Sequence, residues 1–496
     1  MQIVIGGAGK IGEVLCLELA EEGHDIILIE QKEELIDKIV ERSDISGIVG
    51  SIVDYDIQLE AGVPNCDLFI SVTGDDEMNL IGAVLADRLG ANYTVARVGN
   101  PQYGTHMGLM RRALGVSNIT NPRLEAAREI AKNLSSPNSV SVESFAHGRV
   151  NMHEVKIGHE SGLEGMKLSD FRNRFTSLIV CAAKRNEQVI IPDGSFVFTN
   201  GDVVLITGLI NDLEQFYINI GIYKRKIRNV LIIGGGEITN YLCRILERNA
   251  PKTKIAVIEK DDKRAWDLAA EYPDVTVLAG DGTNHQVLDE INYTFYDAIV
   301  ALTGIDEENI MIGLLAAQNK IPKIIVKVNR TEILPIVQDN GLQTIITPKA
   351  IVADSLVRFV RAHENAMGSK VEALHRIFNN EVEVLEFNVK QDSKVLNIPL
   401  KDLPIKNDIL IVFIIRNNQI IFPTGNDSIQ CEDHIVIVSK EKQFYDIDDI
   451  LEEQKTKTKS LETQTYPEPL EILIPGDNIE KDNHAGNIHV PEVQNE

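Results

Sequence analysis

Short hydrophobic runs alternate with longer segments in which hydrophobic and polar residues are mixed. Such runs occupy residues 3–5, 26–30, 67–72 and 93–98, and the segments between them have helical spacing. Strands that are hydrophobic throughout are typical of parallel sheets, because helices cover both of their faces. The pattern therefore predicts an α/β fold built from βαβ units.

The same order of elements recurs in the second half of the chain. Gly9 corresponds to Gly236, at an offset of 227, and Gly74 corresponds to Gly304, at an offset of 230. Internal repetition at a nearly fixed offset indicates one structural unit built twice. In each copy a helix is predicted to begin with proline, at Pro122 and again at Pro348, where a missing N–H costs no hydrogen bond.

A smaller, strand-rich segment follows each α/β region, and it repeats too. Pro192 and Asp202 correspond to Pro423 and Asp433, each at an offset of 231. We expect two Rossmann-like doubly wound parallel-sheet domains, each followed by a small α+β domain. The expected bounds are 1–135, 140–223, 227–364 and 370–452, followed by a polar, largely disordered tail at 453–496.

A glycine fingerprint follows the first strand of the first copy. Gly7 permits a tight turn, Gly9 lets the backbone approach a pyrophosphate, and Gly12 lets helix and strand pack closely. Phosphates would then lie on the N–H groups at the helix N-terminus. Glu30 ends the next strand, and its distance from Gly12 along the chain is near the spacing expected for a ribose-binding carboxylate. A carboxylate there favours NAD(H) or an adenosine nucleotide over NADP(H).

The second copy keeps most of this pattern. Gly234 and Gly236 follow the strand, and Glu259 ends the next one, in the ribose position. Thr239 replaces the third glycine, which predicts a more crowded contact between helix and strand. The second site is therefore less regular than the first.

Charged residues close to the two turns differ between the copies. Lys10 and Glu237 occupy equivalent positions; a cation could reach a terminal phosphate, whereas a carboxylate would repel one. The two sites then differ in ligand preference, unless both side chains only face solvent. Arg97 and Lys327, late in the fifth strands, could bind phosphate, contact a neighbouring subunit or form a surface ion pair.

Two Thr-Gly pairs, Thr73-Gly74 and Thr303-Gly304, follow the fourth strands. The carboxyl ends of parallel strands form the edge where ligands bind in open α/β sheets. Acidic residues come next in both copies, and we expect most of them to start helices, where a carboxylate complements the helix dipole. They are Asp75, Asp76, Glu77, Asp306, Glu307 and Glu308.

Composition narrows the class of protein. The net charge of -25 over 496 residues leaves no basic stripe and argues against nucleic acid as a partner. No run approaches the roughly 20 apolar residues that span a bilayer. The 5 cysteines lack metal-ligand or disulfide-framework spacing. No charged segment stands before an apolar core at the N-terminus, so we expect no secretory leader. We expect a cytoplasmic protein.

Catalytic motifs are absent from the sequence. The 11 histidines form no acid–base constellation, and His147, His153 and His159 are interpreted as surface positions. Nucleotide binding without visible chemistry is typical of a sensor. An NAD-dependent oxidoreductase with duplicated Rossmann domains stays an alternative, and so does a nucleotide-sensing subunit of another ion transporter.

Residues 1 to about 450 resemble the TrkA family of potassium uptake regulators, which carry paired RCK (or KTN) domains. The resemblance rests on the duplicated domain order and on the positions that match the family's nucleotide sites. These are Gly7, Ala8, Gly9, Lys10, Ile11, Gly12, Glu30, Thr73, Gly74, Arg97, Gly234, Gly235, Gly236, Glu237, Ile238, Glu259, Gly280, Asp281, Thr303 and Gly304. Ser51 departs from the pattern, since its counterpart is Asp281.

The resemblance implies a function as well as a fold. It implies non-catalytic binding of NAD(H), and of ATP or ADP. It also implies a homotetramer forming a ring of eight such domains on the inner face of the cell membrane. There the ring would dock on a TrkH-like potassium-transporting subunit and regulate it.

Overall fold

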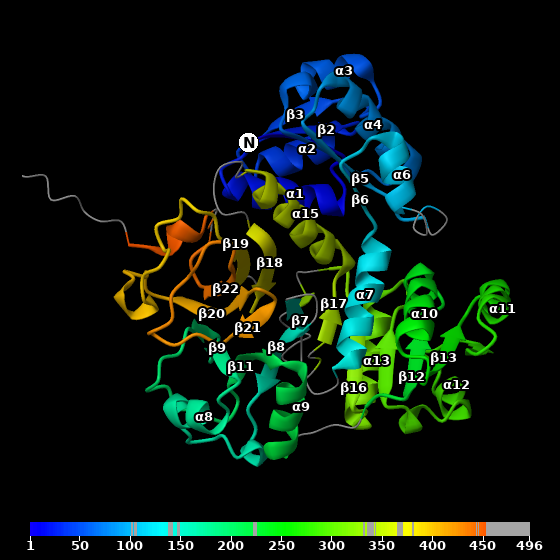
Figure 1. Cartoon of the computed structure of the whole chain (residues 1–496). Coiled ribbons are helices and arrows are strands. Elements are labelled where there is room, and N and C mark those ends of the chain that lie inside the picture. Colours follow the sequence, from blue (N-terminus) through cyan, green and yellow to red (C-terminus); the bar gives the residue numbers. More distant parts are fainter. Residues whose placement is uncertain are drawn as a thin grey trace, which may run out of the picture. The chain divides into compact units, whose positions relative to one another are not determined.

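The computed structural model covers most of the chain. It describes residues 1–100, 103, 107–136, 142–145, 149–221, 226–330, 333–334, 342, 344–364, 371–378, 381–442, 444 and 446–452. The predicted disordered tail at 453–496 lies outside the described residues, and so does His147. We call the chain up to residue 221 the first repeat, and residues 226–452 the second repeat (Figure 1).

The first repeat begins with a six-stranded parallel sheet in the order β3-β2-β1-β4-β5-β6. Its strands are β1 (Gln2–Gly6), β2 (Asp25–Glu30), β3 (Ser46–Val49), β4 (Leu68–Ser71), β5 (Tyr93–Arg97) and β6 (Asn118–Thr120). Its helices are α1 (Lys10–Glu21), α2 (Glu33–Val40), α3 (Tyr55–Glu60), α4 (Asp76–Leu89), α6 (Met107–Leu114) and α7 (Pro122–Ser135). The strand order reverses between β1 and β4, the switch point at which open α/β sheets bind ligands.

The second repeat contains a sheet of the same order, β14-β13-β12-β15-β16-β17. Its strands are β12 (Asn229–Ile233), β13 (Lys254–Glu259), β14 (Thr276–Ala279), β15 (Ala298–Ala301), β16 (Lys323–Lys327) and β17 (Thr344–Ile346). Its helices are α10 (Glu237–Asn249), α11 (Asp262–Glu271), α12 (His285–Glu290), α13 (Asp306–Gln318) and α15 (Pro348–Glu364). The predicted fold class, with two doubly wound parallel sheets, is confirmed, and α7 and α15 begin at the predicted prolines.

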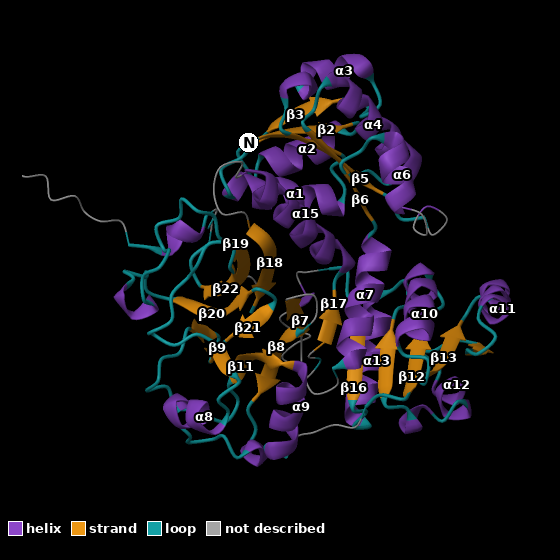
Figure 2. Ribbon diagram, in the orientation of Figure 1, coloured by secondary structure: helices purple, strands orange, loops and turns teal. Residues whose placement is uncertain are grey.

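A small antiparallel sheet follows each large one (Figure 2). The first, β10-β9-β11-β8-β7, consists of β7 (Val142–Phe145), β8 (Val150–Lys156), β9 (Ile179–Arg185), β10 (Gln188–Ile190) and β11 (Val203–Leu209), with α8 (Leu168–Arg174) and α9 (Ile210–Asn219). The second, β18-β19-β22-β20-β21, consists of β18 (Val371–Ile377), β19 (Val382–Asn388), β20 (Ile409–Arg416), β21 (Gln419–Ile421) and β22 (His434–Ser439). Short 3₁₀ helices are η1 (Val63–Asn65), η3 (His159–Ser161), η4 (Tyr293–Phe295), η6 (Leu400–Asp402) and η7 (Ile447–Ile450).

The equivalent residues Asp202 and Asp433 have the same structural role in the two small domains. Asp202 pairs with Arg185 at 2.6 Å, and Asp433 pairs with Arg416 at 2.7 Å. Both carboxylates are almost fully buried, so each needs its guanidinium partner. The two small sheets share one hydrophobic core, in which the rings of Phe145 and Phe413 pack edge to face.

The last helix of each large domain packs against the large sheet of the other repeat. Helix α7 packs on α10 and joins the hydrophobic core of the second large sheet, through Ala126, Ala127, Ile130 and Leu134. Helix α15 packs on α1 and joins the core of the first large sheet, through Val352, Ala353, Leu356, Val357 and Val360. Figure 1 shows both pairs of helices side by side. The two repeats therefore share their cores.

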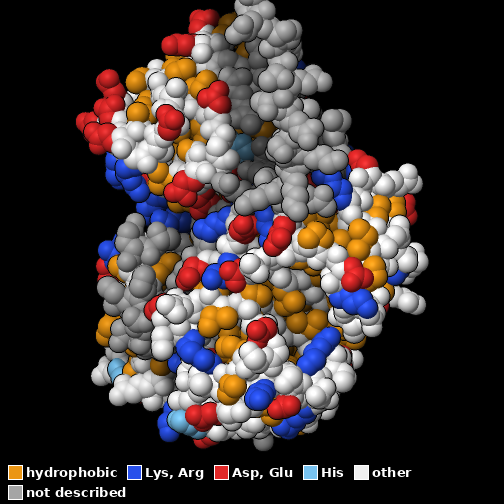
Figure 3. All heavy atoms as spheres, turned by 90° about the vertical axis from the view of Figure 1, so that its left-hand side faces the viewer, with side chains coloured by type: hydrophobic (Ala, Val, Ile, Leu, Met, Phe, Trp, Pro, Cys, Tyr) orange, Lys and Arg blue, Asp and Glu red, His pale blue; other side chains and the backbone are white. Residues whose placement is uncertain are grey.

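On the face drawn in Figure 3, acidic, basic and hydrophobic side chains are interspersed. The cations on this face therefore do not form an uninterrupted basic stripe. Within the described ranges, no helix combines the length and hydrophobicity that crossing a membrane requires.

Candidate functional site

Two glycines of the first fingerprint are required by the backbone. Gly7 has a φ of 108°, in the left-handed region, and a Cβ there would lie 2.9 Å from the backbone nitrogen of Thr73. A Cβ on Gly12 would lie 1.9 Å from the carbonyl oxygen of Gly7. The turn between β1 and α1 thus depends on both residues for its shape.

The middle glycine of each turn is free of such constraints. Gly9 and Gly236 have φ values of -69° and -67°, which any residue can adopt. A Cβ on either would meet nothing within 4 Å, and the same holds for Gly74 and Gly304. The missing side chains leave open space at the carboxyl edge of each sheet. This space fits a ligand that approaches the backbone closely, as a pyrophosphate does.

The two candidate ribose carboxylates lie against their turns. Glu30 accepts a hydrogen bond from the backbone N–H of Ala8 at 2.8 Å, and Glu259 accepts one from the N–H of Gly235. Backbone groups following each strand bind the other carboxylate oxygen. Each carboxylate is therefore held in place, and its remaining lone pairs can accept ribose hydroxyls.

A buried asparagine supports each Thr-Gly pair, and sequence reasoning missed it. The Asn79 side chain accepts from the N–H of Thr73 at 2.8 Å and donates to the carbonyl of Arg97 at 3.0 Å. Asn309 makes the same contacts with Thr303 and Lys327. An asparagine at the same spacing after the threonine in both repeats was the available signal.

The acidic residues that follow have two roles. Asp75 caps α4 by accepting from the N–H of Met78 at 2.8 Å, as expected. Asp76 instead binds the loop after β5, accepting from the N–H of Gly99 at 2.9 Å. Asp306 holds the corresponding loop after β16. These two carboxylates therefore fix the loops beside the turns, a role that helix-start reasoning did not identify.

Arg97 and Lys327 occupy equivalent, half-buried positions at the ends of β5 and β16. Arg97 donates to the carbonyl of Thr73 at 2.6 Å, and its buried Nε has no hydrogen-bond partner. Burial lowers the pKa of the Arg97 guanidinium, and burial also lowers the pKa of Lys327. A bound anion would offset this desolvation, so both positions suit a phosphate.

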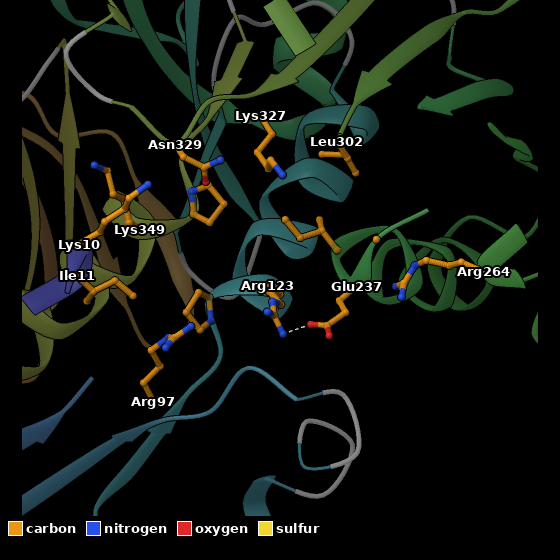
Figure 4. A pocket seen from close by; sticks show the side chains of 14 residues that line it. Lys10, Ile11, Arg97, Arg123, Glu237, Arg264, Leu302, Lys327, Asn329 and Lys349 are labelled. Carbon is orange, nitrogen blue, oxygen red and sulfur yellow. Dashed lines mark ion pairs between the residues drawn. The ribbon is translucent and has the colours of Figure 1, made fainter. Parts of the chain in front are cut away.

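Residues of both repeats line a cavity of about 560 Å³ (Figure 4). Its lining includes the first residues of four helices, α1, α7, α10 and α15, whose N-termini carry partial positive charge. The lining consists of Lys10, Ile11, Arg97, Pro122, Arg123, Gly236, Glu237, Ile238, Arg264, Leu302, Lys327, Asn329, Pro348 and Lys349. Six of these residues are cations and one is an anion, an excess that contrasts with the acidic chain as a whole.

The lining residues correspond in pairs between the repeats. Lys10 corresponds to Glu237 and Arg123 to Lys349, at offsets of 227 and 226. Sequence reasoning did not identify Arg123, Lys349 or Arg264. A basic residue directly after the helix-starting proline in both repeats was the available signal for the first two.

The structure brings six of the positions matched to the family's nucleotide sites to this cavity, namely Lys10, Ile11, Arg97, Gly236, Glu237 and Ile238, together with the candidate phosphate-binding residue Lys327. The other predicted residues do not line it; they are Gly7, Ala8, Gly9, Gly12, Glu30, Thr73, Gly74, Gly234, Gly235, Glu259, Gly280, Asp281, Thr303 and Gly304. Asp281 pairs with Lys260 at 2.7 Å. Its pKa is held below the usual range by the hydrogen bond from Lys260, then by those from Thr283.

The histidines expected at the surface behave differently from one another. His159 is exposed, whereas His153 is buried and contacts the hydroxyl of Tyr217 at 2.9 Å. The surface interpretation is therefore wrong for His153, because its strand β8 lies inside the small sheet. Among the described residues, no group of histidines, cysteines and acids could hold a metal ion.

Comparison with known proteins agrees with this architecture. The TrkA-N domain model matches residues 3–122 and 230–348, and the TrkA-C domain model matches residues 152–221 and 384–452. The chain is also similar to the structure described as "GsuK channel bound to NAD", with a TM-score of 0.57 and 17% identity over 88% of this chain and 76% of that one. At this identity the likeness shows the fold.

Two archaeal relatives match nearly end to end. A Trk system potassium uptake protein TrkA homolog of Archaeoglobus fulgidus is 29% identical over 91% of this chain and 100% of its own length. The homolog 1 protein of Methanosarcina mazei is 30% identical over 81% of this chain and 98% of its own length. With both domain types matched twice in the same order, the chain belongs to the family of Trk system potassium uptake protein TrkA.

Proposed function

We propose that this chain is a non-catalytic, nucleotide-binding regulatory subunit of a potassium uptake system. Its relatives are named as potassium uptake proteins, and a structure of the same fold is described as bound to NAD. NAD(H) is the proposed ligand of the fingerprint turns, and ATP or ADP is a further one. Four domains, bounded at 1–135, 140–223, 227–364 and 370–452, would carry this function.

Each residue of the two turns would contact a particular part of the nucleotide. A pyrophosphate would lie over Gly9 in the first repeat and over Gly236 in the second, at the start of α1 and α10. Glu30 and Glu259 would accept ribose hydroxyls. Backbone groups of the site would come from Ala8, Ile11, Gly235 and Ile238. The positive charge of Arg97 would face the phosphates.

The observation that carries the proposal is the shared cavity. Residues of both fingerprint turns and of both exchanged helices line this cavity. A nucleotide that binds two arrangements of the repeats with different affinity shifts the balance between them. Because α7 and α15 each belong to one repeat and pack on the other, a change at either turn is communicated to both.

The partner would be a TrkH-like membrane subunit that transports potassium. The chain would form a homotetramer, with a ring of eight paired domains, on the cytoplasmic side of that subunit. It would associate peripherally with the membrane through this contact. Ring rearrangement would then change the potassium flux through the partner.

The test uses the full chain with one turn blocked at a time. Gly9→Glu and Gly236→Glu are designed to place a carboxylate where the pyrophosphate would lie, and a Cβ at either position meets nothing within 4 Å. Gly158→Glu is the control, since a Cβ there also meets nothing within 4 Å. Calorimetry with NADH should show the loss of one site in each turn variant and none in the control. In a chain that carries both substitutions, potassium flux through the reconstituted complex should lose its response to nucleotide.

Two outcomes would contradict the proposal. One is unchanged NADH, ADP and ATP binding in both turn variants. The other is normal nucleotide-dependent flux in a complex whose two turns are both blocked.

A further inference from the structure

Equivalent positions in the shared cavity carry different charges in the two repeats. At the first turn, Lys10 of α1 lines the cavity with Lys349 of the exchanged helix α15. The corresponding residues at the second turn are Glu237 of α10 and Arg123 of α7. One pair is therefore doubly positive, and the other pair is neutral.

The neutral pair is engaged by its own contacts. The Arg123 guanidinium forms an ion pair with the Glu237 carboxylate, drawn as a dashed line in Figure 4. The same Arg123 Nη1 lies 3.1 Å from the carbonyl oxygen of Gly99, to which it donates. Arg123 thus joins the second turn to the loop after β5 of the first repeat.

The doubly positive pair is free of such contacts. Within the part of the chain that the structure describes, neither the Lys10 nor the Lys349 side chain has a hydrogen-bond or ion-pair partner. Figure 4 shows the two side chains on the same side of the cavity. Both ammonium groups are therefore available to an anion that extends beyond the first turn.

The remaining cations do not remove this difference. Arg97 and Lys327 are equivalent, and each lies near an equivalent aspartate, Asp76 or Asp306. Arg264 is present only on the side of the second turn, but its Nε donates to the carbonyl of Gly235. The two turns thus differ mainly at the helix-start positions, where Lys10 and Glu237 lie.

We infer that the Arg123–Glu237 pair makes the second turn reject a terminal phosphate, whereas the first turn accepts one. This rests on the proposed function. A pyrophosphate over Gly9 or Gly236 leaves the next phosphate at the start of the helix. The first turn meets it with two ammonium groups, and the second meets it with a carboxylate. The first site therefore takes a nucleoside triphosphate, and the second takes a dinucleotide or a nucleoside diphosphate.

The experiment isolates each site in the full chain. Gly236→Glu leaves only the first site, and Gly9→Glu leaves only the second. Calorimetry with ATP, ADP and NADH then gives a dissociation constant for each site. We expect ATP to bind the first site at least about tenfold more tightly than the second, with NADH binding both.

Charge exchange tests the assignment of the residues. In the Gly9→Glu chain, Glu237→Lys should strengthen ATP binding about tenfold and change NADH binding much less. Glu237→Gln should have an intermediate effect, and Glu247→Gln, at an exposed position on the same helix, should have none. In the Gly236→Glu chain, Lys10→Glu should weaken ATP binding about tenfold.

The outcomes separate this inference from the proposed function. If neither blocked turn loses a nucleotide, the proposed function fails. If each variant loses its own site but the two remaining sites bind ATP equally, the inference alone is wrong. It is also overturned if Glu237→Lys leaves the ratio of ATP to NADH affinity unchanged.

Discussion

The hydroxyl of Thr239 donates a hydrogen bond to the carbonyl of Gly234 at 2.5 Å. Thr239 stands where the first repeat has Gly12, which packs so closely that a Cβ would overlap the Gly7 carbonyl. The predicted crowding at the second turn is therefore accommodated by a hydrogen bond between the side chain and the turn. Thr239 is fully buried, so this bond also satisfies its hydroxyl.

The first turn should be intolerant of the same change. We expect Gly12→Ala to lower the free energy of unfolding by about 2 kcal/mol or more, because the new methyl group forces helix α1 away from its strand. Urea unfolding without nucleotide measures this. Gly9→Ser, at the unconstrained N-cap, should stay within about 0.5 kcal/mol of the unmodified chain. Equal midpoints for all three chains would contradict the packing argument.

Glu30 should determine the preference for NAD over NADP. A carboxylate beside the ribose repels a 2′-phosphate, so Glu30→Ser should lower the ratio of NADP to NAD dissociation constants by about tenfold. Calorimetry on the Gly236→Glu chain, which retains only the first site, gives both constants. Glu34→Ser, at an exposed position of α2, is the matched control. An unchanged ratio in Glu30→Ser would remove Glu30 from the ribose role.

Arg361 should contribute strongly to stability. This guanidinium, only 1% exposed, contacts Glu22 at 2.7 Å and Glu383 at 2.8 Å, and so connects α15 with the first repeat and the small sheet of the second. Arg361→Met removes this guanidinium from two buried carboxylates. It should lower the free energy of unfolding by about 3–5 kcal/mol.

The control for this prediction is an exposed pair. Arg128 contacts Glu125 one helical turn away at 2.7 Å, and Arg128→Met should cost less than about 1 kcal/mol. Thermal unfolding compares the two variants. If both variants showed similarly small shifts in unfolding temperature, the Arg361 cluster would not be a source of stability.

His153 should make the chain less stable in mild acid. Burial lowers its pKa from 6.5 to about 3, so the folded state binds no proton there until the pH is near that value. The unfolded chain takes up this proton as the pH falls below 6.5, and stability is therefore lost over that window. At pH 5 the loss amounts to about 2 kcal/mol.

A variant comparison measures this loss. The free energy of unfolding of His153→Gln should fall less between pH 7 and pH 5 than that of the unmodified chain. His159→Gln, at an exposed position of the same small domain, should keep the original pH dependence. Parallel pH profiles for His153→Gln and the unmodified chain would show that the buried imidazole is not responsible.

Much of the fold could be predicted because its signals are local. Hydrophobic runs fix the parallel strands, and prolines at 122 and 348 fix two helix starts. The exchange of α7 and α15 could not be predicted in this way. A helix with an apolar stripe can cover either sheet, and only the competition between the two sheets decides which one it covers.

The candidate site was predictable to the same degree. The glycines and Glu30 follow from backbone geometry within one repeat. Arg123 and Lys349 reach the cavity only through the exchanged helices, so their sequence positions resemble those of ordinary solvated cations. Asn79 could have been identified from the sequence, because its counterpart Asn309 lies 230 residues later. Gly74 and Gly304 are separated by the same offset.

The exchange of helices also bears on how the chain is made. The first large sheet is complete once residue 120 has left the ribosome, yet the helix that covers it ends at residue 364. At about 5–20 residues per second, roughly ten to fifty seconds separate these events during synthesis. Through that interval the nascent chain exposes the hydrophobic face that Val352, Leu356 and Val360 later cover. Slow elongation or chaperone binding over this stretch would therefore decide how much of the protein escapes aggregation.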